Sequence, residues 1–300
     1  MVGITGASGF VGQNLVNYLS EFGISQLAIS RQELNSNDFS KFNIAESLVH
    51  LAGKAHDLKS VSNPEDYIKI NYELTKKLYD AFLQSSCSKF IFISSVKAVA
   101  DHLDNVLTEE FVPNPKTTYG LSKLMAEKYI QSQPLPIGKS YYILRPCMVH
   151  GPGNKGNLNL LYKIISRGIP YPLTAFENKR SFLSIENLCF VILELLERND
   201  IPSGVYIVAD DEALSTNELI NLIGQASGHT PELWNLNRKL IRSLAKLGDI
   251  LRLPLNSERL KKLTENYIVE NRKLKKALGR DLPVGAKEGI LKTIRSFNQR

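Results

Sequence analysis

Short apolar runs that suit β-strands alternate with helical stretches through the first half of the chain, and this alternation limits the possible folds most. The runs read VGIT, QLAIS, SLVHLAG, KFIFISS and SYYILRPCMV, and helical patterns cover residues 12–21, 71–85 and 119–132. Strands that alternate with helices predict βαβ units and a parallel sheet, and right-handed crossovers place helices on both of its faces. We therefore expect an α/β fold with a doubly wound parallel sheet.

The pattern loosens after Pro152, which predicts a second and smaller part of the chain. A glycine-rich loop and a helix come first, followed by SFLSIENLCFVILELLER, which suits a short strand and a helix, and by the strand-like GVYIVAD. Ser215 and Glu218 form a capping box that predicts a helix start. We expect one domain from residues 1–153 plus about 182–210, and a C-terminal lobe from about 154–181 and 211–300.

The first expected strand runs into TGASGFVG, in which Gly6, Gly9 and Gly12 lead into the first helix. Glycines let the backbone turn sharply and approach a diphosphate, whose charge is favoured at a helix N-terminus. The spacing GxxGxxG differs from the GxGxxG fingerprint, so the motif alone also fits an ordinary glycine-rich turn. Between a strand and a helix, it predicts a Rossmann-type domain that binds NAD or NADP. We then expect the C-terminal lobe to bind the substrate.

The end of the second strand, AISRQEL, bears on which dinucleotide is bound. An NAD site usually has an acidic residue here that holds the ribose 2′-hydroxyl, and a nearby arginine accommodates the 2′-phosphate of NADP. Ser30 stands where the acid is expected, and Arg31 follows it. This pattern favours NADP, unless Arg31 simply points into solvent.

Tyr119 and Lys123 lie four residues apart on an expected helix, so they share one of its faces. A free tyrosine has a pKa near ~10, which a nearby ammonium and the positive ring of an oxidised nicotinamide would lower. Such a tyrosine can exchange a proton with a carbinol while a hydride moves to or from the cofactor. Ser95 ends a neighbouring strand, where open α/β sheets bind ligands, and it could hydrogen-bond the reacting oxygen.

Composition adds expectations about compartment and metals. The chain has 300 residues, 43% of them hydrophobic, with no run of about 18 apolar residues and no apparent secretory signal. Cys87, Cys147 and Cys189 are dispersed, which suits a reducing cytoplasm rather than disulfides or structural zinc. The five histidines lack metal-ligand spacing. We expect a cytoplasmic protein without a bound metal.

Several of these stretches occur together in one family. The chain resembles the extended short-chain dehydrogenase/reductase proteins, in the NAD-dependent nucleotide-sugar epimerase/dehydratase branch, over nearly its whole length. The matching stretches are TGASGFVG, VHLAG, NYELT, FIFISS, YGLSK, ILRPCMVHGPG, RSFLSIENL and ENRKLKKALG. Within the branch it is most similar to bacterial enzymes of surface-polysaccharide (O-antigen) synthesis, close to UDP-hexose 4-epimerases and 4-keto-sugar reductases.

The resemblance implies roles for the matching residues. Tyr119 would be the catalytic acid/base, Lys123 its partner and Ser95 the third catalytic residue. The residues that would bind the cofactor are Gly6, Ser8, Gly9, Phe10, Val11, Gly12, Ser30, Arg31, Leu51, Ala52, Gly53, Lys54, Asn71, Tyr119, Lys123 and Pro146. Those that would bind the substrate are Ser95, Val96, Lys97, Asn157 and, at the diphosphate, Arg180. His150 stands where the family often has a tyrosine.

One departure from the family narrows the activity. Sugar 4,6-dehydratases place an Asp–Glu pair directly after the residue equivalent to Ser95, where this chain has Val96 and Lys97. Elimination of water is therefore not expected. Two reactions at C4 of a UDP-hexose or UDP-N-acetylhexosamine skeleton remain, namely 4-epimerisation and NADPH-dependent reduction of a UDP-4-keto-6-deoxy sugar. Arg31 favours the reductase and the overall resemblance favours the epimerase, which we place first.

A non-catalytic dinucleotide-binding regulator is a further hypothesis, because a fold does not determine a function. Such proteins commonly lose the catalytic tyrosine or lysine, and both are present in this chain. The resemblance also implies a homodimer formed through the helices at Asn71–Ser85 and Tyr119–Gln131.

The positive charge of the chain is concentrated near its C-terminus. Residues 238–300 hold 17 Lys/Arg and 6 Asp/Glu, a net +11, so the rest of the chain carries −4 of the overall +7. Such a region can attract phosphates, nucleic acid or anionic lipid, although we expect no nucleic-acid partner. RKLIRSLAKLGDILRL (238–253) has apolar residues at helical spacing with basic residues between them. It suits either packing against the C-terminal lobe or weak association with an anionic membrane.

Overall fold

The computed structural model describes residues 1–36, 38–54, 63–154, 157–228, 230–251 and 256–297. Its strands are β1 (Val2–Thr5), β2 (Gln26–Ile29), β3 (Ser47–His50), β4 (Lys89–Ile93), β5 (Ser140–Pro146), β6 (Met148–His150), β7 (Phe182–Ser184) and β8 (Gly204–Val208). Its α-helices are α1 (Phe10–Glu21), α2 (Arg31–Ser36), α3 (Pro64–Tyr67), α4 (Leu74–Gln84), α5 (Thr118–Ser132), α6 (Asn157–Ile165), α7 (Ile185–Glu197), α8 (Thr216–Ser227), α9 (Arg238–Leu251), α10 (Ser257–Thr264), α11 (Arg272–Leu278) and α12 (Ala286–Phe297). Two short 3₁₀-helices, η1 (Ser40–Asn43) and η3 (Val96–Ala98), and a π-helical segment, η2 (Ile68–Glu73), complete these elements.

Six strands form a parallel sheet in the order β2-β1-β3-β4-β5-β8. Because β2 and β3 lie on opposite sides of β1, the winding of the chain reverses between β1 and β3. In open α/β sheets, ligands bind at such a switch point, outside the carboxyl ends of the strands. The predicted doubly wound α/β fold is confirmed.

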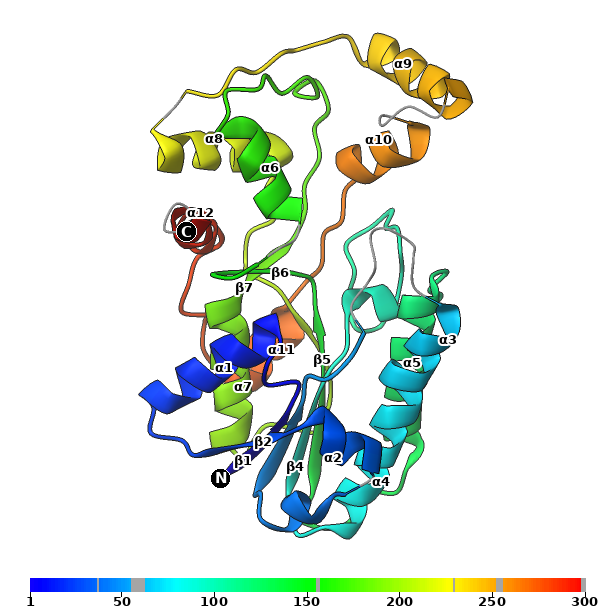
Figure 1. Cartoon of the computed structure of the whole chain (residues 1–300), viewed down its shortest axis with the longest axis vertical. Coiled ribbons are helices and arrows are strands. Elements are labelled where there is room, and N and C mark those ends of the chain that lie inside the picture. Colours follow the sequence, from blue (N-terminus) through cyan, green and yellow to red (C-terminus); the bar gives the residue numbers. More distant parts are fainter. Residues whose placement is uncertain (37, 55–62, 155–156, 229, 252–255, 298–300) are drawn as a thin grey trace.

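Helices cover both faces of this sheet, with α1, α7 and α11 on one face and α4 and α5 on the other (Figure 1). Successive strand residues enter the two cores alternately. On β4, Phe90 and Phe92 pack with α4 and α5, whereas Ile91 between them packs with α1 and α7. Burial on both faces explains why the strands read as nearly continuous apolar runs.

The predicted strand SYYILRPCMV is divided in the structure. β5 ends at Pro146, which has no amide hydrogen to continue a ladder. After Cys147 the chain enters β6, which leaves the large sheet and pairs with β7 in a second, two-stranded sheet. The break therefore supplies the route from the large sheet towards the C-terminal lobe.

The helix predicted at 71–85 begins earlier than expected. Asn63 caps α3 by accepting a hydrogen bond from the Glu65 N–H, and α3 continues through η2 into α4. The π-helical segment η2 contains the fully buried Asn71. Single π-turns within helices occur frequently at functional sites.

The C-terminal segments form a second body beyond the carboxyl end of the sheet (Figure 1). α6, α8, α9, α10 and α12 share an apolar core, in which Ile165, Leu219 and Ile290 are buried. In contrast, α11 buries Leu274 and Leu278 in the core of the large sheet. The chain therefore returns to the sheet before it forms α12, and the proposed domain boundaries stay a prediction.

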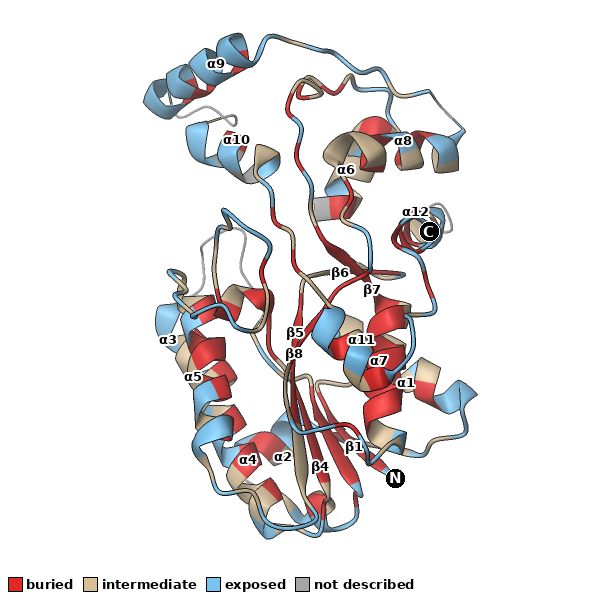
Figure 2. Ribbon diagram, turned by 180° about the vertical axis from the view of Figure 1, so that it is seen from behind, coloured by how far each residue is buried: buried red, intermediate tan, exposed pale blue. Residues whose placement is uncertain are grey.

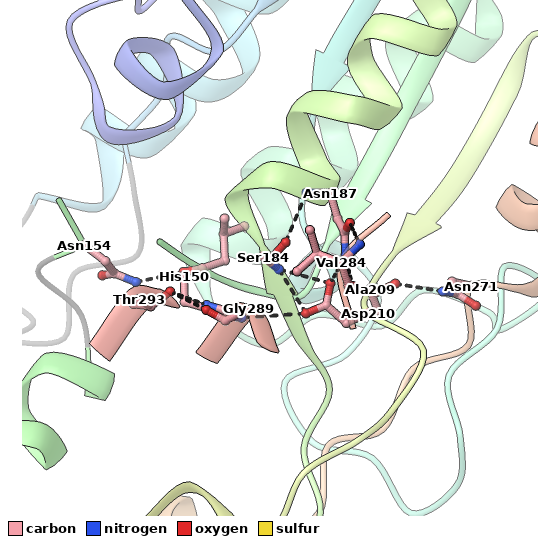
Figure 3. A network of polar contacts seen from close by, with 11 residues as sticks. His150, Asn154, Ser184, Asn187, Ala209, Asp210, Asn271, Val284, Gly289 and Thr293 are labelled. Atoms are coloured by element: carbon pink, nitrogen blue, oxygen red, sulfur yellow. Dashed lines mark hydrogen bonds and ion pairs between the residues drawn. The ribbon is translucent and has the colours of Figure 1, made fainter. Parts of the chain in front are cut away.

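A buried polar network joins the large sheet to α12 (Figure 3). Asp210, which follows β8, accepts hydrogen bonds from the Ser184 N–H and from the Asn187 side-chain amide. His150 Nε2 lies 3.7 Å from Asp210 Oδ2, and His150 Nδ1 lies 2.8 Å from Thr293 Oγ1 of α12. His150 therefore helps to hold the last helix against β6.

His50, at the end of β3, is buried and has a partner at each ring nitrogen. Thr5 Oγ1 lies 2.7 Å from Nδ1, and Thr75 Oγ1 lies 3.0 Å from Nε2. Thr75 donates its own hydrogen to the Asn71 carbonyl, so it accepts from Nε2–H, and Nδ1 accepts from Thr5. A neutral ring satisfies this network, and burial lowers the pKa of His50 to about 3.

Replacement of His50 by glutamine should make the protein less sensitive to acid. The pKa of His50 is lower in the folded than in the unfolded state, so at pH values between about 6.5 and about 3 only the unfolded chain takes up this proton. Folding stability therefore falls as the pH falls, by on the order of 2 kcal/mol between about pH 7 and about pH 5. Urea unfolding at about pH 7 and about pH 5 should show a smaller loss of folding stability for His50→Gln than for the wild type. Equal losses in the wild type and His50→Gln would contradict this account.

Candidate active site

Gly6 and Gly9 lie in the tight turn between β1 and α1, and Gly12 lies in the first turn of α1 against it. Gly6 has a φ of 72°, and a Cβ there would lie 2.7 Å from the Ala52 nitrogen. A Cβ on Gly12 would lie 2.3 Å from the Gly6 carbonyl oxygen, to which the Gly9 N–H donates. The turn therefore excludes side chains at Gly6 and Gly12, and it places the start of α1 at the switch point of the sheet. The remaining predicted residues of this region are Ser8 in the turn and Phe10 and Val11 in the first turn of α1.

The segment Leu51–Lys54 follows β3 beside this turn. The Lys54 N–H donates to Asn71 Oδ1 at 2.7 Å, and Asn71 Nδ2 donates back to the Lys54 carbonyl at 3.1 Å. Asn71 Nδ2 also donates to Ser122 Oγ of α5 at 3.1 Å. The amide of Asn71 therefore fastens the segment after β3 to α5.

Ser95 and Tyr119 meet at the carboxyl end of β4. Their side chains are hydrogen-bonded, and only 9% of Ser95 is exposed. Gly120 permits this approach, because a Cβ there would lie 2.3 Å from the Lys97 carbonyl oxygen. Thr117 caps α5 by accepting a hydrogen bond from the Gly120 N–H, which sets where the helix begins.

Burial raises the pKa of Tyr119, and the hydrogen bond with Ser95 acts in the opposite direction. The sequence led us to expect a lowered pKa, because we counted the ammonium of Lys123 and the charge of a nicotinamide ring. In the protein alone the pKa is shifted in the opposite direction, because burial of the phenol away from solvent has the largest effect. A positive charge bound beside Tyr119 would lower the pKa again.

Lys123 lies one turn further along α5 and is 6% exposed. Its Nζ donates to the Ile93 carbonyl at 2.8 Å and lies 4.7 Å from the centre of the Phe92 ring. Burial lowers the pKa of Lys123 to about 8, although the carboxylate of Glu127 acts against this shift. A Cβ on Gly53 would lie 3.3 Å from Nζ, so the ammonium is next to the segment predicted to line the cofactor.

A buried ion pair lies behind Lys123 and was not predicted. Glu127 of α5 accepts hydrogen bonds from Arg145 of β5, with 2.6 Å between Nη2 and Oε2, and from the Ser94 hydroxyl. Removing one partner of such a pair leaves a buried charge uncompensated, typically at a cost of about 3–5 kcal/mol. The pair therefore holds α5 firmly on β4 and β5, and no sequence motif marks it.

Val96 and Lys97 begin η3 directly after Ser95. Val96 is buried, whereas Lys97 Nζ donates to the Asp101 carbonyl at 2.7 Å and lies 4.0 Å from the centre of the Tyr267 ring. Tyr267 comes from the C-terminal region, and no local pattern in the sequence pointed to it. The side chain of Lys97 is thus placed where the strand ends of the sheet meet the C-terminal lobe.

Arg180 reaches the same region from the segment before β7. Its backbone pairs with Tyr267, its Nε donates to the Glu265 carbonyl at 3.3 Å, and its Nη2 lies 3.7 Å from the Glu265 carboxylate. Burial lowers the pKa of Arg180. Lys97 and Arg180 therefore both adjoin the Tyr267 segment. Asn157 opens α6, and its side chain lies outside the described residues.

Ser30 and Arg31 follow β2 and are exposed. Glu33, three residues after Ser30, folds back on the first turn of α2 and brings a carboxylate close to this strand end. Glu33 Oε2 accepts a hydrogen bond from the Ser30 N–H at 2.8 Å, and the Glu33 N–H donates to Ser30 Oγ at 3.2 Å. Lys41 lies 2.7 Å from the same carboxylate, and its hydrogen bond is the main reason that the pKa of Glu33 falls to about 2. The sequence signal was the Ser–x–x–Glu spacing of a capping box.

The structure thus gathers most of the predicted residues at one edge of the sheet. β1, β3, β4 and β5 each end there, and Pro146 is the last residue of β5. Over the described part of the chain, no three His, Cys, Asp or Glu side chains are placed to hold a metal ion. None of the described helices is both long and apolar enough to cross a membrane.

Comparison with known proteins decides the family. The profile of the NAD dependent epimerase/dehydratase family matches residues 2–209, which include the glycine-rich turn, Ser95, Tyr119 and Lys123. The chain belongs to this family. An NAD(P) cofactor and a nucleotide-sugar substrate are typical of it.

Relatives within the family differ in activity. UDP-glucose 4-epimerase of Vibrio cholerae is 29% identical over 324 aligned positions, which cover 99% of this chain and 95% of the relative. GDP-6-deoxy-D-mannose reductase of Pseudomonas aeruginosa is 24% identical over 237 positions, which cover 73% of this chain and 78% of the relative. The solved UDP-N-acetylglucosamine 4-epimerase from Bacillus cereus has the same fold, with a TM-score of 0.79 and 21% identity. The match covers 100% of this chain and 99% of that structure.

Proposed function

We propose that the protein transfers a hydride at C4 of a UDP-hexose or UDP-N-acetylhexosamine and works as a 4-epimerase. The observation that carries the proposal is the convergence of Ser95, Tyr119 and Lys123 at the end of β4, beside the Leu51–Lys54 segment. The similarity to an epimerase over nearly the whole chain supports it. The glycine-rich turn supports it too, because it presents a helix N-terminus at the switch point, where a dinucleotide diphosphate fits.

The named side chains supply the proton transfer. Tyr119 removes the proton of the 4-hydroxyl, and Ser95 hydrogen-bonds the same oxygen and holds it in place. Lys123, fixed by the Ile93 carbonyl, provides positive charge that stabilises the phenolate of Tyr119. When bound, NAD(P) would accept the hydride from C4 and return it. Tyr119 would then return the proton to the C4 oxygen as hydride enters the opposite face of C4, which completes the epimerisation.

The other predicted residues are assigned on the same basis. We propose that residues 1–153 and 182–210 bind the dinucleotide, and that 154–181 and 211–300 bind the sugar nucleotide, except that α11 belongs with the sheet into which it packs. Lys97, Asn157 and Arg180 are the proposed substrate contacts. A homodimer through α4 and α5 is proposed from the family resemblance.

A 4-keto-sugar reductase that uses NADPH is the second candidate. Arg31 and Lys41 place positive charge after β2, where a 2′-phosphate would lie, and one relative is a reductase. Glu33 weakens this argument, since it brings a carboxylate to the same place. A regulator without activity is less well supported, because all three proposed catalytic residues are present and Ser95 and Tyr119 are in contact.

The nucleotide released from the denatured, purified protein separates these candidates. For an epimerase, mass spectrometry should find retained NAD(P), and the protein should interconvert UDP-glucose and UDP-galactose, or their N-acetyl forms, without added cofactor. An empty site together with NADPH oxidation by a UDP-4-keto-6-deoxy sugar would replace the epimerase with the reductase. Cofactor binding with neither activity would indicate a regulator.

A pair of glycine variants controls this measurement. Gly12→Val should lose the nucleotide, because its Cβ would lie 2.3 Å from the Gly6 carbonyl oxygen. Gly285→Val should keep it, since no atom lies within 4 Å of a Cβ at that position. Retention by Gly12→Val would show that the nucleotide is bound elsewhere.

A further inference from the structure

The helix α9 carries an apolar stripe that is exposed in the described part of the structure. Leu240, Leu244, Leu247 and Leu251 recur at helical spacing and so line one side of the helix; we call them the leucine stripe. These leucines are 46–58% exposed. α9 lies at the outer end of the molecule, and most of its surface is exposed (Figure 2). Such a row of large apolar side chains at the surface commonly marks a binding site.

The leucine stripe is not what attaches α9 to the protein. Ile241 and Ala245, on the adjacent side of the helix, are buried in the core of the C-terminal lobe. The guanidinium carbons of Arg238 and Arg242 lie 5.9 and 6.0 Å from the centre of the Phe176 ring. These contacts fix the orientation of α9 and turn the leucine stripe outwards.

Positive charge borders the leucine stripe. An α-helix turns by about 100° per residue. This rotation places Ile250, Lys239 and Lys246 at successive positions around the helix, next to the leucine stripe. Ile250 is 77% exposed. The acidic residue of α9, Asp249, accepts hydrogen bonds from the backbone and hydroxyl of Ser257. With four basic residues and one acidic residue, α9 has a net charge of +3.

We propose that α9 binds the surface of an anionic lipid bilayer. The leucine stripe enters the boundary between headgroups and acyl chains, and Lys239 and Lys246 lie at the level of the lipid phosphates. An exposed apolar side flanked by lysines is the arrangement of helices that lie in the membrane interface. Each basic residue near an anionic surface adds to the attraction, and this attraction falls off within a Debye length. The inference does not depend on which sugar nucleotide the active site accepts.

Charge argues against a second copy of the chain as the occupant. A two-fold contact through the leucine stripe would bring the same patch of both copies together. Lys239 and Lys246 of one copy would then face the same lysines of the other, and juxtaposed like charges are unfavourable. An anionic bilayer supplies the opposite charge over the whole patch.

Co-sedimentation of the full chain with lipid vesicles tests this proposal. We expect binding to vesicles of phosphatidylglycerol mixed with phosphatidylcholine, weaker binding at high salt, and little binding to phosphatidylcholine alone. Leu244→Asp combined with Leu247→Asp should lower the partition coefficient by at least roughly tenfold. Lys239→Glu combined with Lys246→Glu should also lower the partition coefficient, and this variant removes no buried side chain.

A matched control separates the leucine stripe from exposed apolar residues in general. Val112 and Ile137 are 82% and 106% exposed and lie outside α9, so Val112→Asp combined with Ile137→Asp should bind vesicles like the wild type. Thermal unfolding and turnover of a soluble substrate confirm that each variant is folded. Absence of wild-type binding to the anionic vesicles overturns the proposal, and so does unchanged binding by both α9 variants. A smaller oligomer of the leucine variant in light scattering, without vesicle binding by the wild type, would show instead that copies of the chain meet at this patch.

Discussion

Replacement of Tyr119 by phenylalanine should lower turnover by roughly 10²–10⁴-fold, the usual contribution of a positioned acid/base. The ring stays in place, while the hydroxyl that contacts Ser95 is lost. Cofactor binding should therefore change little. Steady-state rates with UDP-glucose or UDP-N-acetylglucosamine, and calorimetric titration with NAD and NADP, measure the two effects separately.

The same helix provides a control for this variant. Tyr129 also lies on α5, where its hydroxyl donates to Asp80 at 2.5 Å, away from Ser95. Tyr129→Phe removes the same group from the same helix and should leave turnover nearly unchanged. If Tyr119→Phe kept full turnover, Tyr119 would not be the acid/base, and the proton transfer would have to be assigned to another residue.

Replacement of Lys123 by methionine should affect activity and stability in opposite directions. Turnover should fall by at least roughly a hundredfold, because the phenolate of Tyr119 loses its neighbouring positive charge. The free energy of unfolding at about pH 7 should rise by up to roughly 3 kcal/mol, since a pKa of about 8 means that the fold penalises the buried ammonium. Loss of the hydrogen bond to the Ile93 carbonyl offsets part of this gain.

The pH dependence distinguishes this explanation from a general packing effect. Below about pH 8 both the folded and the unfolded chain carry the proton of Lys123, so the penalty is constant. Between about pH 8 and about pH 10.5 the folded protein loses this proton before the unfolded chain does. The wild type therefore gains stability as the pH rises, and its difference from Lys123→Met shrinks. Urea unfolding at about pH 7 and about pH 10 tests this, with the exposed Lys128→Met of the same helix as the control. A Lys123→Met variant that is less stable than the wild type at both pH values would contradict the expectation.

Residues whose roles follow from local geometry could be predicted from the chain. The four-residue interval between Tyr119 and Lys123 puts them on one face of any helix, and Ser95 lies at a strand end wherever the sheet forms. The glycines of the first turn belong to the same group, because the backbone there admits no side chain at Gly6 or Gly12.

Other features depend on segments that meet only after folding. Tyr267 reaches Lys97 from far along the sequence, and Glu127 meets Arg145 through the packing of α5 on the sheet. No short pattern marks such pairs, since neither residue has a fixed spacing from its partner. The burial that raises the pKa of Tyr119 in the protein alone likewise depends on distant segments and not on neighbours in sequence.

The amino-acid sequence by itself determined the doubly wound sheet, the glycine-rich turn and the side chains available for hydride transfer chemistry. Helical and strand periodicity act over a few residues, so these features can be read directly from the chain. Tertiary structure alone decided how deeply Tyr119 and Lys123 are buried, how Asn71 braces the site and which side of α9 faces outwards. These properties depend on the solvent that distant segments exclude, and exclusion of solvent is a property of the packed molecule.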